Sequence, residues 1–329
     1  MKILVTGGAG YIGSHFLKEL RNQGYESKDI LIIDDLSSGS KKNIIFGKLI
    51  VANILDKEEV EKIVSSFKPD LIVHFAAFIS VPESIKEPTK YYENNFVGSL
   101  NLINAAIKNN VNKFIFSSTA AVYGIPEIMP ISENSELKPL NPYGNSKKMV
   151  EELLRDTKLA NSKFNYVILR YFNVAGSDPE LEIGNRKKEP ENLISIIINN
   201  LQSNKNEIKI FGNDFETADG TGVRDYIHVS DLAKAHISVI ENLEKGSFTF
   251  NVGYGNGSSV LDVVSAVEKI TKIEIKRNFV DRRLGDPAVS IADNSKILKL
   301  TNWKPKYNNL DLMIKHAWNW VNMLNKTNN

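Results

Sequence analysis

Tyr143 and Lys147 have residue types and a spacing that suit proton transfer from a hydroxyl group. They are four residues apart in a segment, residues 141–147, that opens a predicted helix, so both side chains point to one face of it. A tyrosine is a poor base at neutral pH because its ordinary pKa is about 10, but a neighbouring ammonium group favours the phenolate and lowers that pKa. We therefore expect Tyr143 to act as a general base that takes a proton from a substrate hydroxyl.

Hydroxyl side chains precede this pair, at the end of a buried apolar run over residues 114–116. Ser117, Ser118 and Thr119 follow the run directly. Thr119 or Ser118 is expected to hydrogen-bond the reacting oxygen and to hold it in place. A Tyr-x-x-x-Lys spacing alone is more often an exposed helix pair, because it is common by chance. The catalytic interpretation therefore depends on this hydroxyl cluster and on a glycine-rich turn upstream.

The glycine-rich turn lies near the N-terminus and has the form of a phosphate-binding loop. Residues 3–5 predict a strand buried on both faces, then come Gly7, Gly10 and Gly13, and a helix is predicted over residues 11–20. The first glycine permits a tight turn, the second lets a diphosphate approach the backbone, and the third lets the helix pack closely on the strand. Free N–H groups at the helix start would face the anion.

Asp34 follows a second apolar run, residues 30–33, about 20 residues beyond the glycines. A carboxylate at this distance accepts hydrogen bonds from both hydroxyls of the adenosine ribose and repels a 2′-phosphate, so NAD is favoured over NADP. Lys41 and Lys42 are near enough in the chain to leave this preference open. An oxidised nicotinamide ring would add a second positive charge near Tyr143 and accept hydride from the carbon that bears the deprotonated hydroxyl.

The composition excludes several classes of function. The chain has 329 residues, a formal net charge of +2 and no cysteine. Disulfides, thiolate metal sites and a cysteine nucleophile are therefore excluded, no metal site is predicted, and neither nucleic acid nor a membrane is expected as a partner. The N-terminus has no signal-peptide pattern, and no apolar run approaches membrane-spanning length. These features fit an enzyme of a reducing cytoplasm.

Apolar runs that alternate with helix-like segments predict an α/β fold with a doubly wound parallel sheet, the Rossmann architecture. The expected strands are residues 3–5, 30–33, 48–51, 71–77 and 114–116, and the expected helices are residues 11–20, 57–67, 89–109 and about 141–160. Ligands of such a sheet bind at the carboxyl ends of its strands, so each catalytic group is expected just after a strand.

From residue 178 the alternation weakens, and a smaller α+β lobe is expected to cover the strand ends. We place the dinucleotide-binding domain at residues 1–177 and the substrate lobe at residues 178–329. The regular elements expected in the lobe are a helix over residues 192–202 and a strand over residues 208–211. His228 lies between two apolar neighbours and is expected to be a satisfied core histidine.

Eight segments resemble, in the same order, signature segments of the UDP-glucose/UDP-galactose 4-epimerase family within the extended short-chain dehydrogenase/reductase superfamily. They are residues 7–15, 74–77, 91–95, 117–124, 141–144, 170–176, 219–229 and 250–255. The resemblance implies a nucleotide-sugar isomerase of carbohydrate and galactose metabolism that holds NAD⁺ tightly and inverts C4 of a UDP-hexose through a 4-keto intermediate. It also implies that segments near 228–253 return to the main sheet and that the chain forms a homodimer through helices of the first domain.

The resemblance also assigns roles by position, with Thr119, Tyr143 and Lys147 as the catalytic residues. The cofactor-binding positions are Gly7, Gly10, Tyr11, Ile12, Gly13, Asp34, Asp35, Asn53, Ile54, Phe75, Ala76, Ala77, Asn94, Ser117, Tyr143, Lys147 and Tyr171. The substrate-binding positions are Ser118, Thr119, Tyr143, Asn173, Asn192, Phe211, Arg224, Arg283, Asp286 and Ser290. The two arginines correspond to diphosphate-binding residues, a role that suits the planar guanidinium fork. A surface salt bridge, with Asp225 or Asp286 as partner, is the structural alternative for each of them.

Three positions depart from the family pattern. Asn53 stands where a carboxylate often contacts adenine, and Ile79 replaces a lysine that some members have near the cofactor. Ser290 stands where many glucose-specific members have a tyrosine beside the C2 substituent of the hexose. Because the smaller side chain leaves room for an N-acetyl group, UDP-N-acetylglucosamine and UDP-N-acetylgalactosamine are predicted as further substrates. The structural alternative is that Ser290 is simply a small loop residue.

Two other functions remain open. A nucleotide-sugar 4,6-dehydratase of the same superfamily usually carries Asp-Glu after the threonine, where this chain has Ala120 and Ala121. A non-catalytic NAD-sensing protein is the second alternative, because a fold alone does not assign chemistry. The presence of Thr119, Tyr143 and Lys147 together argues against a sensor.

Overall fold

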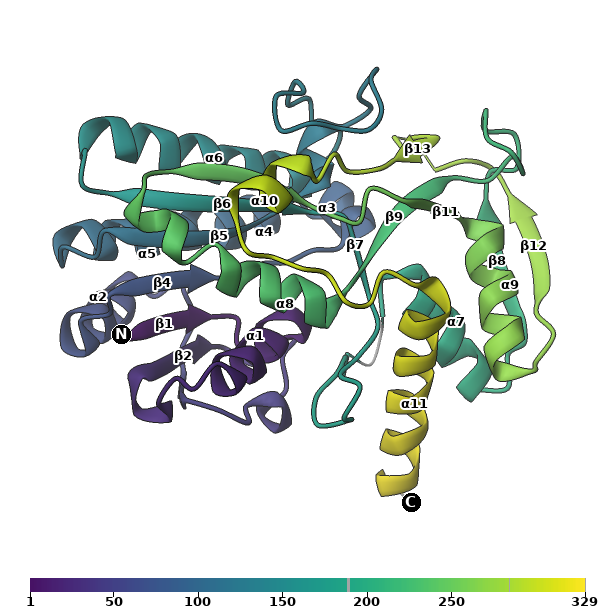
Figure 1. The fold of residues 1–329 in the computed structure, drawn as a ribbon, viewed down its shortest axis with the longest axis horizontal. Helices are drawn as coiled ribbons and strands as arrows, with labels where there is room; N and C mark the ends of the chain where they lie inside the picture. Colours follow the sequence, from purple (N-terminus) through teal and green to yellow (C-terminus); the bar gives the residue numbers. More distant parts are fainter. Residues whose placement is uncertain (188–189, 284, 329) are drawn as a thin grey trace.

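A seven-stranded parallel sheet forms the centre of the molecule (Figure 1). The structure is a computed structural model that describes residues 1–187, 190–283 and 285–328. Along the sheet the strands follow the order β10-β6-β5-β4-β1-β2-β3. Their bounds are β1 Ile3–Thr6, β2 Ile30–Asp34, β3 Lys48–Val51, β4 Leu71–His74, β5 Lys113–Thr119, β6 Asn165–Tyr171 and β10 Phe248–Val252. The order reverses between β1 and β4, which confirms the predicted doubly wound Rossmann sheet.

Helices cover both faces of this sheet, because successive side chains of each strand point to opposite faces. Ile3 and Val5 pack in one apolar cluster with side chains from α1 (Tyr11–Asn22) and α8 (Val229–Ser238). Leu4 packs on the opposite face with side chains from three further helices. These helices are α2 Lys57–Phe67, α5 Gly98–Lys108 and α6 Pro142–Ala160. Burial on both faces is why these strands are continuous apolar runs in the sequence.

The segment predicted as one helix over residues 89–109 is instead divided. It consists of α4 (Pro88–Tyr91), a π-helical segment η3 (Tyr92–Val97) and α5, and it follows a short helix α3 (Val81–Lys86) that the sequence did not predict. A π-turn widens the helix locally and often occurs at functional sites. Here it presents Asn94 to the main cavity. The prediction of one regular helix was therefore wrong in the stretch nearest the cavity.

Two strand ends also differ from their prediction. The strand expected over residues 71–77 ends at His74, so the small residues that follow it form a loop. The strand expected over residues 114–116 continues to Thr119, because Ser117 to Thr119 pair with β6 as far as Tyr171. The three hydroxyl residues therefore lie within the strand rather than after it.

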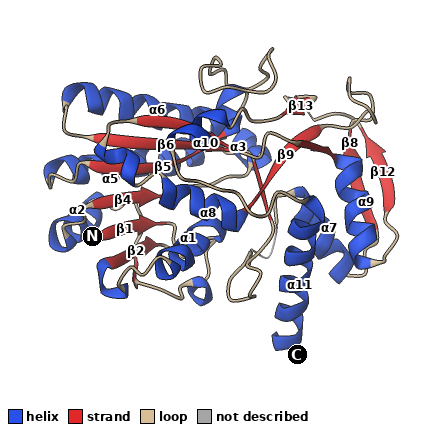
Figure 2. Cartoon of the chain, in the orientation of Figure 1, coloured by secondary structure: helices blue, strands red, loops and turns tan. Residues whose placement is uncertain are grey.

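A smaller group of strands and helices lies at the carboxyl ends of the large sheet (Figure 2). β9 (Val223–His228) pairs in parallel with β7 (Asn173–Ala175) and β13 (Val289–Ser290), and antiparallel with β11 (Gly257–Ser259). A separate two-stranded sheet joins β8 Glu207–Phe211 to β12 Lys276–Val280. The helices of this part are α7 Leu193–Gln202, α9 Val260–Thr271 and α11 Leu310–Asn328. A further helix, α10 Ser295–Leu300, lies against β10 of the large sheet. α7, α9 and α11 pack on one another beside these strands.

After β9 the chain returns to the large sheet. α8 packs against α1, and β10 pairs in parallel with β6, with Phe248 opposite Val167 and Val252 opposite Tyr171. The edge strand of the large sheet therefore comes from a segment that lies after β7, β8 and β9 in the sequence.

His228 is a core histidine, as predicted. Its Nδ1 accepts a hydrogen bond from the backbone N–H of Ser230 at 3.0 Å, and its Nε2 lies 3.0 Å from Nδ1 of His316. Because Nδ1 accepts a hydrogen bond, the neutral ring carries its proton on Nε2, and this N–H donates a hydrogen bond to His316. Burial lowers the pKa of His228 to about 2, so the ring is neutral at ordinary pH.

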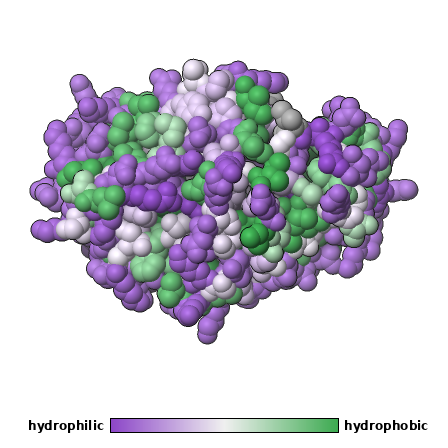
Figure 3. All heavy atoms as spheres, turned by 90° about the horizontal axis from the view of Figure 1, so that it is seen from above, coloured by the Kyte–Doolittle hydropathy of each residue, from purple (hydrophilic) through white to green (hydrophobic). Residues whose placement is uncertain are grey.

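The surface mixes apolar and polar side chains without a dominant patch on the face seen in Figure 3. Most exposed apolar residues, such as Ile128 and Leu159, have no exposed apolar neighbour in the sequence; Phe279 and Val280 are adjacent. None of the described helices is long and apolar enough to cross a membrane.

Candidate active site

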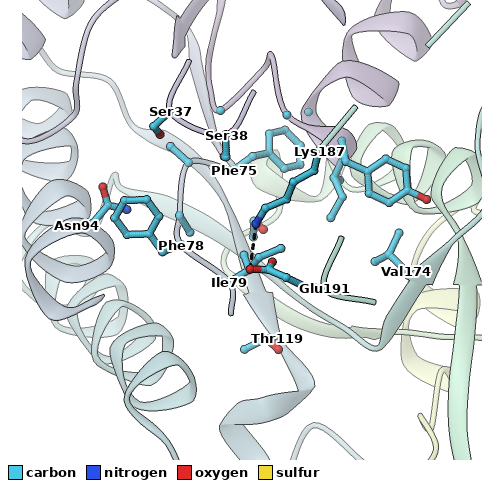
Figure 4. Close-up of a pocket in the computed structure, with 18 of the residues that line it drawn as sticks. Ser37, Ser38, Phe75, Phe78, Ile79, Asn94, Thr119, Val174, Lys187 and Glu191 are labelled. Atoms are coloured by element: carbon cyan, nitrogen blue, oxygen red, sulfur yellow. Dashed lines mark ion pairs between the residues drawn. The ribbon is translucent and has the colours of Figure 1, made fainter. Parts of the chain in front are cut away.

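A cavity of about 400 Å³ opens at the carboxyl ends of the parallel strands. Five strands of the large sheet contribute residues to its wall at or directly after their last positions: Gly7 after β1, Asp34 in β2, Phe75 after β4, Thr119 in β5 and Tyr171 in β6. Figure 4 shows part of this wall. The expectation that the functional groups gather at the strand ends is thus met by a single cavity.

The glycine-rich turn forms one wall of the cavity. Gly7 has a positive φ of 73°, and a Cβ on it would lie 2.5 Å from the backbone nitrogen of Ala76. A Cβ on Gly13 would collide with the carbonyl oxygen of Gly7. Gly10 is the N-cap of α1 and brings no side-chain oxygen to the free N–H groups, and the first turn has no acidic residue. This helix start therefore fits an anion, since no carboxylate among the described residues is hydrogen-bonded to its first N–H groups.

Two carboxylates lie at the end of β2. Asp34 accepts hydrogen bonds from the backbone N–H groups of Ala9 and Leu36, each at 2.9 Å, and burial raises its pKa. Asp35 accepts a hydrogen bond from the Nδ2 of Asn53 at 3.0 Å. Asn53 itself is not among the described residues that line the cavity, so it acts on the site through Asp35. A ribose beside Asp34 fits this acceptor set.

Tyr143 and Lys147 come from the first two turns of α6. Asn141 caps this helix by accepting a hydrogen bond from the N–H of Gly144 at 2.9 Å, and Pro142 occupies the first turn, where its missing N–H costs nothing. Both Tyr143 and Lys147 line the cavity together with Thr119, the last residue of β5. The predicted grouping of these three residues is therefore present.

The electrostatic environment of this group differs from the expectation. Burial raises the pKa of Tyr143 to about 12, although hydrogen bonding to Thr119 acts in the opposite direction. Burial also lowers the pKa of Lys147 to about 7. The ammonium of Lys147 donates to the carbonyl oxygen of Ser117 at 2.9 Å. Burial is the largest influence on the phenol pKa of Tyr143, and the ammonium of Lys147, which was expected to lower that pKa, is directed to the backbone of β5.

A buried charged network lies under this helix face. Glu151 is fully buried and accepts hydrogen bonds from Ser118 Oγ at 2.6 Å, from Arg155 Nη2 at 2.8 Å, and from Arg170 Nε and Nη2 at 2.9 and 2.5 Å. Ser118 therefore does not line the cavity, although Ser117 and Thr119 on either side do. The reason is the alternation of side chains along β5, which sends the middle hydroxyl to the opposite face.

Most sequence-predicted site residues line the cavity, and seven do not. Those on its wall are Gly7, Gly10, Tyr11, Ile12, Gly13, Asp34, Asp35, Ile54, Phe75, Ala76, Ala77, Asn94, Ser117, Thr119, Tyr143, Lys147, Tyr171, Asn173 and Asn192. Those placed elsewhere are Asn53, Ser118, Phe211, Arg224, Arg283, Asp286 and Ser290. Asn192 also caps α7, with its Oδ1 accepting from the N–H of Ser195 at 2.8 Å.

Five of the residues placed elsewhere form a second cluster at the smaller sheets. The guanidinium of Arg283 pairs with Asp286 at 2.9 Å and lies over the ring of Phe211, 4.7 Å from its centroid. Arg224 is opposite Ser290 in the pairing of β9 with β13. Burial lowers the pKa of Arg224, and the nearby charge of Asp286 opposes that shift. The salt-bridge alternative therefore holds for Arg283, whose partner is Asp286.

Arg224 does not pair with its neighbour Asp225. That carboxylate is buried and accepts hydrogen bonds from the backbone N–H groups of Tyr254, Gly255 and Ala292 at 2.9, 2.9 and 3.2 Å. The guanidinium of Arg224 donates instead to the carbonyl oxygen of Val223 at 2.9 Å. Its remaining donors thus have no carboxylate hydrogen-bonded to them within the described part of the chain.

Sequence reasoning missed several residues of the cavity wall. They include Ser37, Ser38, Phe78, Glu83, Phe172, Val174, Asn185, Lys187 and Glu191. Ile79, which stands where some family members have a lysine near the cofactor, also lines the cavity. Lys187 and Glu191 form an ion pair of 2.9 Å, drawn as a dashed line in Figure 4. Their spacing of four residues was the only available signal, and it lies in a stretch without regular hydrophobic periodicity.

Taken residue by residue, the cavity fits a dinucleotide. The start of α1 suits its diphosphate, Asp34 suits a ribose, and the group of Thr119, Tyr143 and Lys147 lies where a reactive ring would meet a hydroxyl-bearing carbon. No described residue adds a metal ligand set to this wall: the one cluster of three acidic side chains, Asp178, Glu180 and Glu182, surrounds the ammonium of Lys18 instead.

Comparisons with known proteins agree with this interpretation. Residues 3–253 match the model of the NAD dependent epimerase/dehydratase family. The UDP-glucose 4-epimerase of Azospirillum brasilense is 42% identical over 329 residues, which cover 99% of this chain and 93% of that protein. A similar solved structure is that of the UDP-glucose 4-epimerase of Stenotrophomonas maltophila, which holds bound NAD and formylated UDP-arabinopyranose. The two structures superpose with a TM-score of 0.94 at 36% identity, and the match covers 99% of each chain.

A third relative is the UDP-Glc/GlcNAc 4-epimerase of Campylobacter jejuni. Its structure is similar with a TM-score of 0.86 at 45% identity, and the match covers 98% of this chain and 99% of that one. The family match spans more than half of the chain, and the relatives align over almost its full length. The chain therefore belongs to the NAD dependent epimerase/dehydratase family.

Proposed function

We propose that this protein is a UDP-hexose 4-epimerase that interconverts UDP-glucose and UDP-galactose through a transient 4-keto sugar. The observation that carries the proposal is the convergence of the glycine turn with Thr119, Tyr143 and Lys147 on one cavity. Bound NAD⁺ supplies the acceptor and donor of the C4 hydride. Full-length similarity to UDP-glucose 4-epimerases supports the same reaction.

The chain's own contribution to the chemistry is proton transfer and positioning. Tyr143 takes the proton from the sugar's 4-hydroxyl and later returns it, and Thr119 holds that oxygen by a hydrogen bond. Because burial raises the pKa of Tyr143 to about 12, the phenol needs added positive charge to act as a base near neutral pH. Protonated Lys147 and an oxidised cofactor ring both supply such charge. Burial lowers the pKa of Lys147 to about 7, so an anion bound in the cavity would help to keep it protonated.

The nucleotide half of the substrate is held by residues around and beyond the cavity. Asn173 and Asn192 line the wall nearest the smaller sheets. Arg224 and Arg283 offer guanidinium forks for a diphosphate, and Asp286 and Phe211 lie beside them. On this proposal the diphosphate displaces Asp286 from Arg283, since a doubly charged phosphate group is the stronger partner.

The substrate range extends to UDP-N-acetylglucosamine and UDP-N-acetylgalactosamine. Ser290 lies opposite Arg224 in the strand pairing, close to the proposed diphosphate-binding arginines. A serine leaves space there that a tyrosine would fill. The similarity to the UDP-Glc/GlcNAc 4-epimerase of Campylobacter jejuni supports this wider range.

The alternatives are not favoured. Ala120 and Ala121 follow Thr119 in a short 3-10 helix, where a 4,6-dehydratase needs acidic residues for water elimination. A non-catalytic NAD sensor has no need for Tyr143 and Lys147 beside a hydroxyl at a strand end. A sensor should leave bound NAD⁺ oxidised when UDP-sugar is added, whereas an epimerase should show absorbance of the reduced nicotinamide.

The proposal also covers organisation. Residues 1–177, with segments near 228–253, form the NAD-binding domain, and residues 178–329 form the UDP-sugar lobe. The protein is a homodimer of the cytoplasm, joined through helices of the first domain. Light scattering of the purified protein tests the dimer, and a monomeric mass would contradict it.

The central experiment is to incubate the protein separately with UDP-glucose, UDP-N-acetylglucosamine and their C4 epimers, and to resolve the products by chromatography. We expect conversion of each sugar to its C4 epimer. The variant Tyr143→Phe is expected to lose about 10² to 10⁴-fold in kcat while it retains NAD, since it lacks only the proton-transfer group. Conversion by the variant at the wild-type rate would refute the assigned base, and absence of any epimer from the wild type would refute the proposed function.

A further inference from the structure

Lysines 147 and 187 are the cationic side chains among the described residues that line the cavity. Lys147 is buried, donates to the Ser117 carbonyl and lies over the ring of Phe116 at 4.9 Å, so its position is set by β5. Lys187 has no such backbone acceptor in the hydrogen bonds of the described chain. Its ammonium extends into the cavity, where it forms an ion pair of 2.9 Å with Glu191 (Figure 4) and acts through its charge on Glu83, whose pKa it helps to lower.

The backbone on which Lys187 stands is firmly held. The N–H of Lys187 donates to Asn185 Oδ1 at 3.0 Å, and the carbonyl oxygen of Asn185 accepts from the indole of Trp320 at 2.9 Å. Arg186 donates to Asn43 Oδ1 at 3.0 Å and its guanidinium lies over the ring of Trp320. A buried tryptophan of α11 and an asparagine beside the glycine turn therefore fix the turn that carries Lys187, and its long side chain alone is free to change partners.

We propose that Lys187 is a phosphate-binding residue of the cofactor site, which exchanges Glu191 for the diphosphate of the bound dinucleotide. Both side chains of the pair with Glu191 are about one-third exposed, so water screens it and it is a weak ion pair. A diphosphate in the same cavity carries two negative charges and is a stronger partner for an ammonium. Four carboxylates line the described wall, Asp34, Asp35, Glu83 and Glu191, so an anionic cofactor needs a cation there.

The position of Lys187 favours the dinucleotide over the UDP-sugar as the source of this diphosphate. Lys187 shares its cavity with the glycine turn and with Ser37 and Ser38, which follow β2. The arginines proposed for the UDP diphosphate, Arg224 and Arg283, are outside the described wall of that cavity. The inference rests on the proposed function only in that it takes NAD and a UDP-sugar as the two ligands. Because the test measures binding rather than turnover, its outcome is independent of the epimerase reaction.

The test measures NAD binding in full-length variants. Lys187→Gln is compared with Lys187→Arg, with Glu191→Gln and with Lys148→Gln. The last is a matched control, because Lys148 is similarly exposed and forms an i,i+4 pair with Glu152 at 3.7 Å on α6. The NAD content of each purified protein is measured after denaturing extraction, and the Kd for NAD is measured by calorimetry on protein stripped of nucleotide. UDP binding is measured in parallel.

We expect Lys187→Gln to raise the Kd for NAD about tenfold, the size of one charge-assisted hydrogen bond, and to leave UDP affinity unchanged. Lys187→Arg should bind NAD within about threefold of wild type, because it keeps the charge. Glu191→Gln should tighten NAD binding about two- to fivefold, because it removes the competing carboxylate. Lys148→Gln should match wild type.

Two results would overturn the inference. The first is an unchanged NAD Kd in Lys187→Gln, and the second is a loss confined to UDP, which would assign Lys187 to the substrate. If Lys187→Gln does not fold, as judged by circular dichroism, the test depends on Glu191→Gln alone. Weaker NAD binding in Glu191→Gln would overturn the exchange. An ion pair that only supports the structure should lose NAD affinity when either of its two residues is replaced. Epimerase turnover of the wild type is recorded separately, so failure here leaves the proposed reaction untouched.

Discussion

Glu151 offers the sharpest test of how the catalytic helix is held. Its carboxylate is fully buried and accepts four hydrogen bonds, from Ser118, Arg155 and twice from Arg170. The substitution Glu151→Gln keeps the size and shape of the side chain but removes its charge. The guanidinium of Arg170, which is 2% exposed, then loses its only acidic partner within the described chain.

The expected cost follows from this burial. Leaving one partner of a buried ion pair without its counter-charge costs about 3–5 kcal/mol of folding free energy. The neighbouring Glu152 is the control, because it is about half exposed and its pair with Lys148 is 3.7 Å long. An exposed i,i+4 pair on a helix contributes only about 0.3–0.5 kcal/mol. Glu152→Gln should therefore be nearly silent, although it makes the same chemical change one residue along the same helix.

The assay is equilibrium denaturation by urea at pH 7.5, followed by circular dichroism, for wild type and both variants. If the unfolding is cooperative, the midpoint of Glu151→Gln falls well below that of Glu152→Gln at an unchanged slope. A difference of less than about 1 kcal/mol between the two variants would refute the reasoning, since it would mean that Arg170 finds another counter-charge. A second readout concerns Lys147, whose pKa the charge of Glu151 raises; losing that charge should move the alkaline limit of activity to lower pH.

Three further outcomes are expected. Gly13→Ala should lower both the NAD content and the melting temperature of the purified protein, because its Cβ would collide with the carbonyl oxygen of Gly7; full NAD retention would contradict the tight-turn argument. Ser290→Tyr should reduce kcat/KM for the N-acetylated sugars about tenfold or more while sparing UDP-glucose, and equal losses on both would count against a role in specificity. Burial lowers the pKa of His228 to about 2, far below its value of about 6.5 in the unfolded chain, so the unfolded state alone takes up this proton as the pH falls below about 6.5. The variant His228→Asn retains an acceptor for the N–H of Ser230 and should lose less stability than wild type between pH 7 and pH 5. The difference in unfolding free energy should grow by about 1.4 kcal/mol per pH unit below pH 6. If the unfolding free energies of both proteins, measured in urea, fell equally with pH, the ring of His228 would not take up a proton on unfolding.

Five strands of the large sheet, β1 to β5, were predicted from local patterns, whereas β6 was not among the expected strands and β10 was expected only from the family resemblance. Strands such as β1 and β2 are buried on both faces and therefore appear as unbroken apolar runs, and the helix over Lys57–Phe67 has an apolar face at regular spacing. The pairing of Tyr143 with Lys147 could also be predicted from the sequence, since any helix places residues four apart on one face. These predictions needed no knowledge of distant contacts.

Other parts of the site depend on contacts that no local pattern encodes. The side of β5 that Ser118 faces depends on how far the strand extends, and that is decided by pairing with β6 up to Tyr171. Lys187 reaches the cavity because a turn anchored by Trp320, far away in the sequence, holds it there. The π-helical segment at Asn94 interrupts the regular helix, and no residue type in that stretch predicts the interruption. In each case tertiary structure selects among local conformations that the sequence allows.

The return of the chain to β10 has a consequence for how the molecule can form during synthesis. β6 keeps an open edge until residues 248–252 have left the ribosome, by which time β7, β8 and β9 have already emerged. An unpaired strand edge is a template for aggregation, so a fragment that stops at residue 177 should be insoluble rather than a minimal nucleotide-binding module. The long sequence separation between β6 and β10 also predicts slow folding, in which closure of the sheet waits for the smaller strands to assemble. The two parts of the protein are thus coupled in time as well as in space.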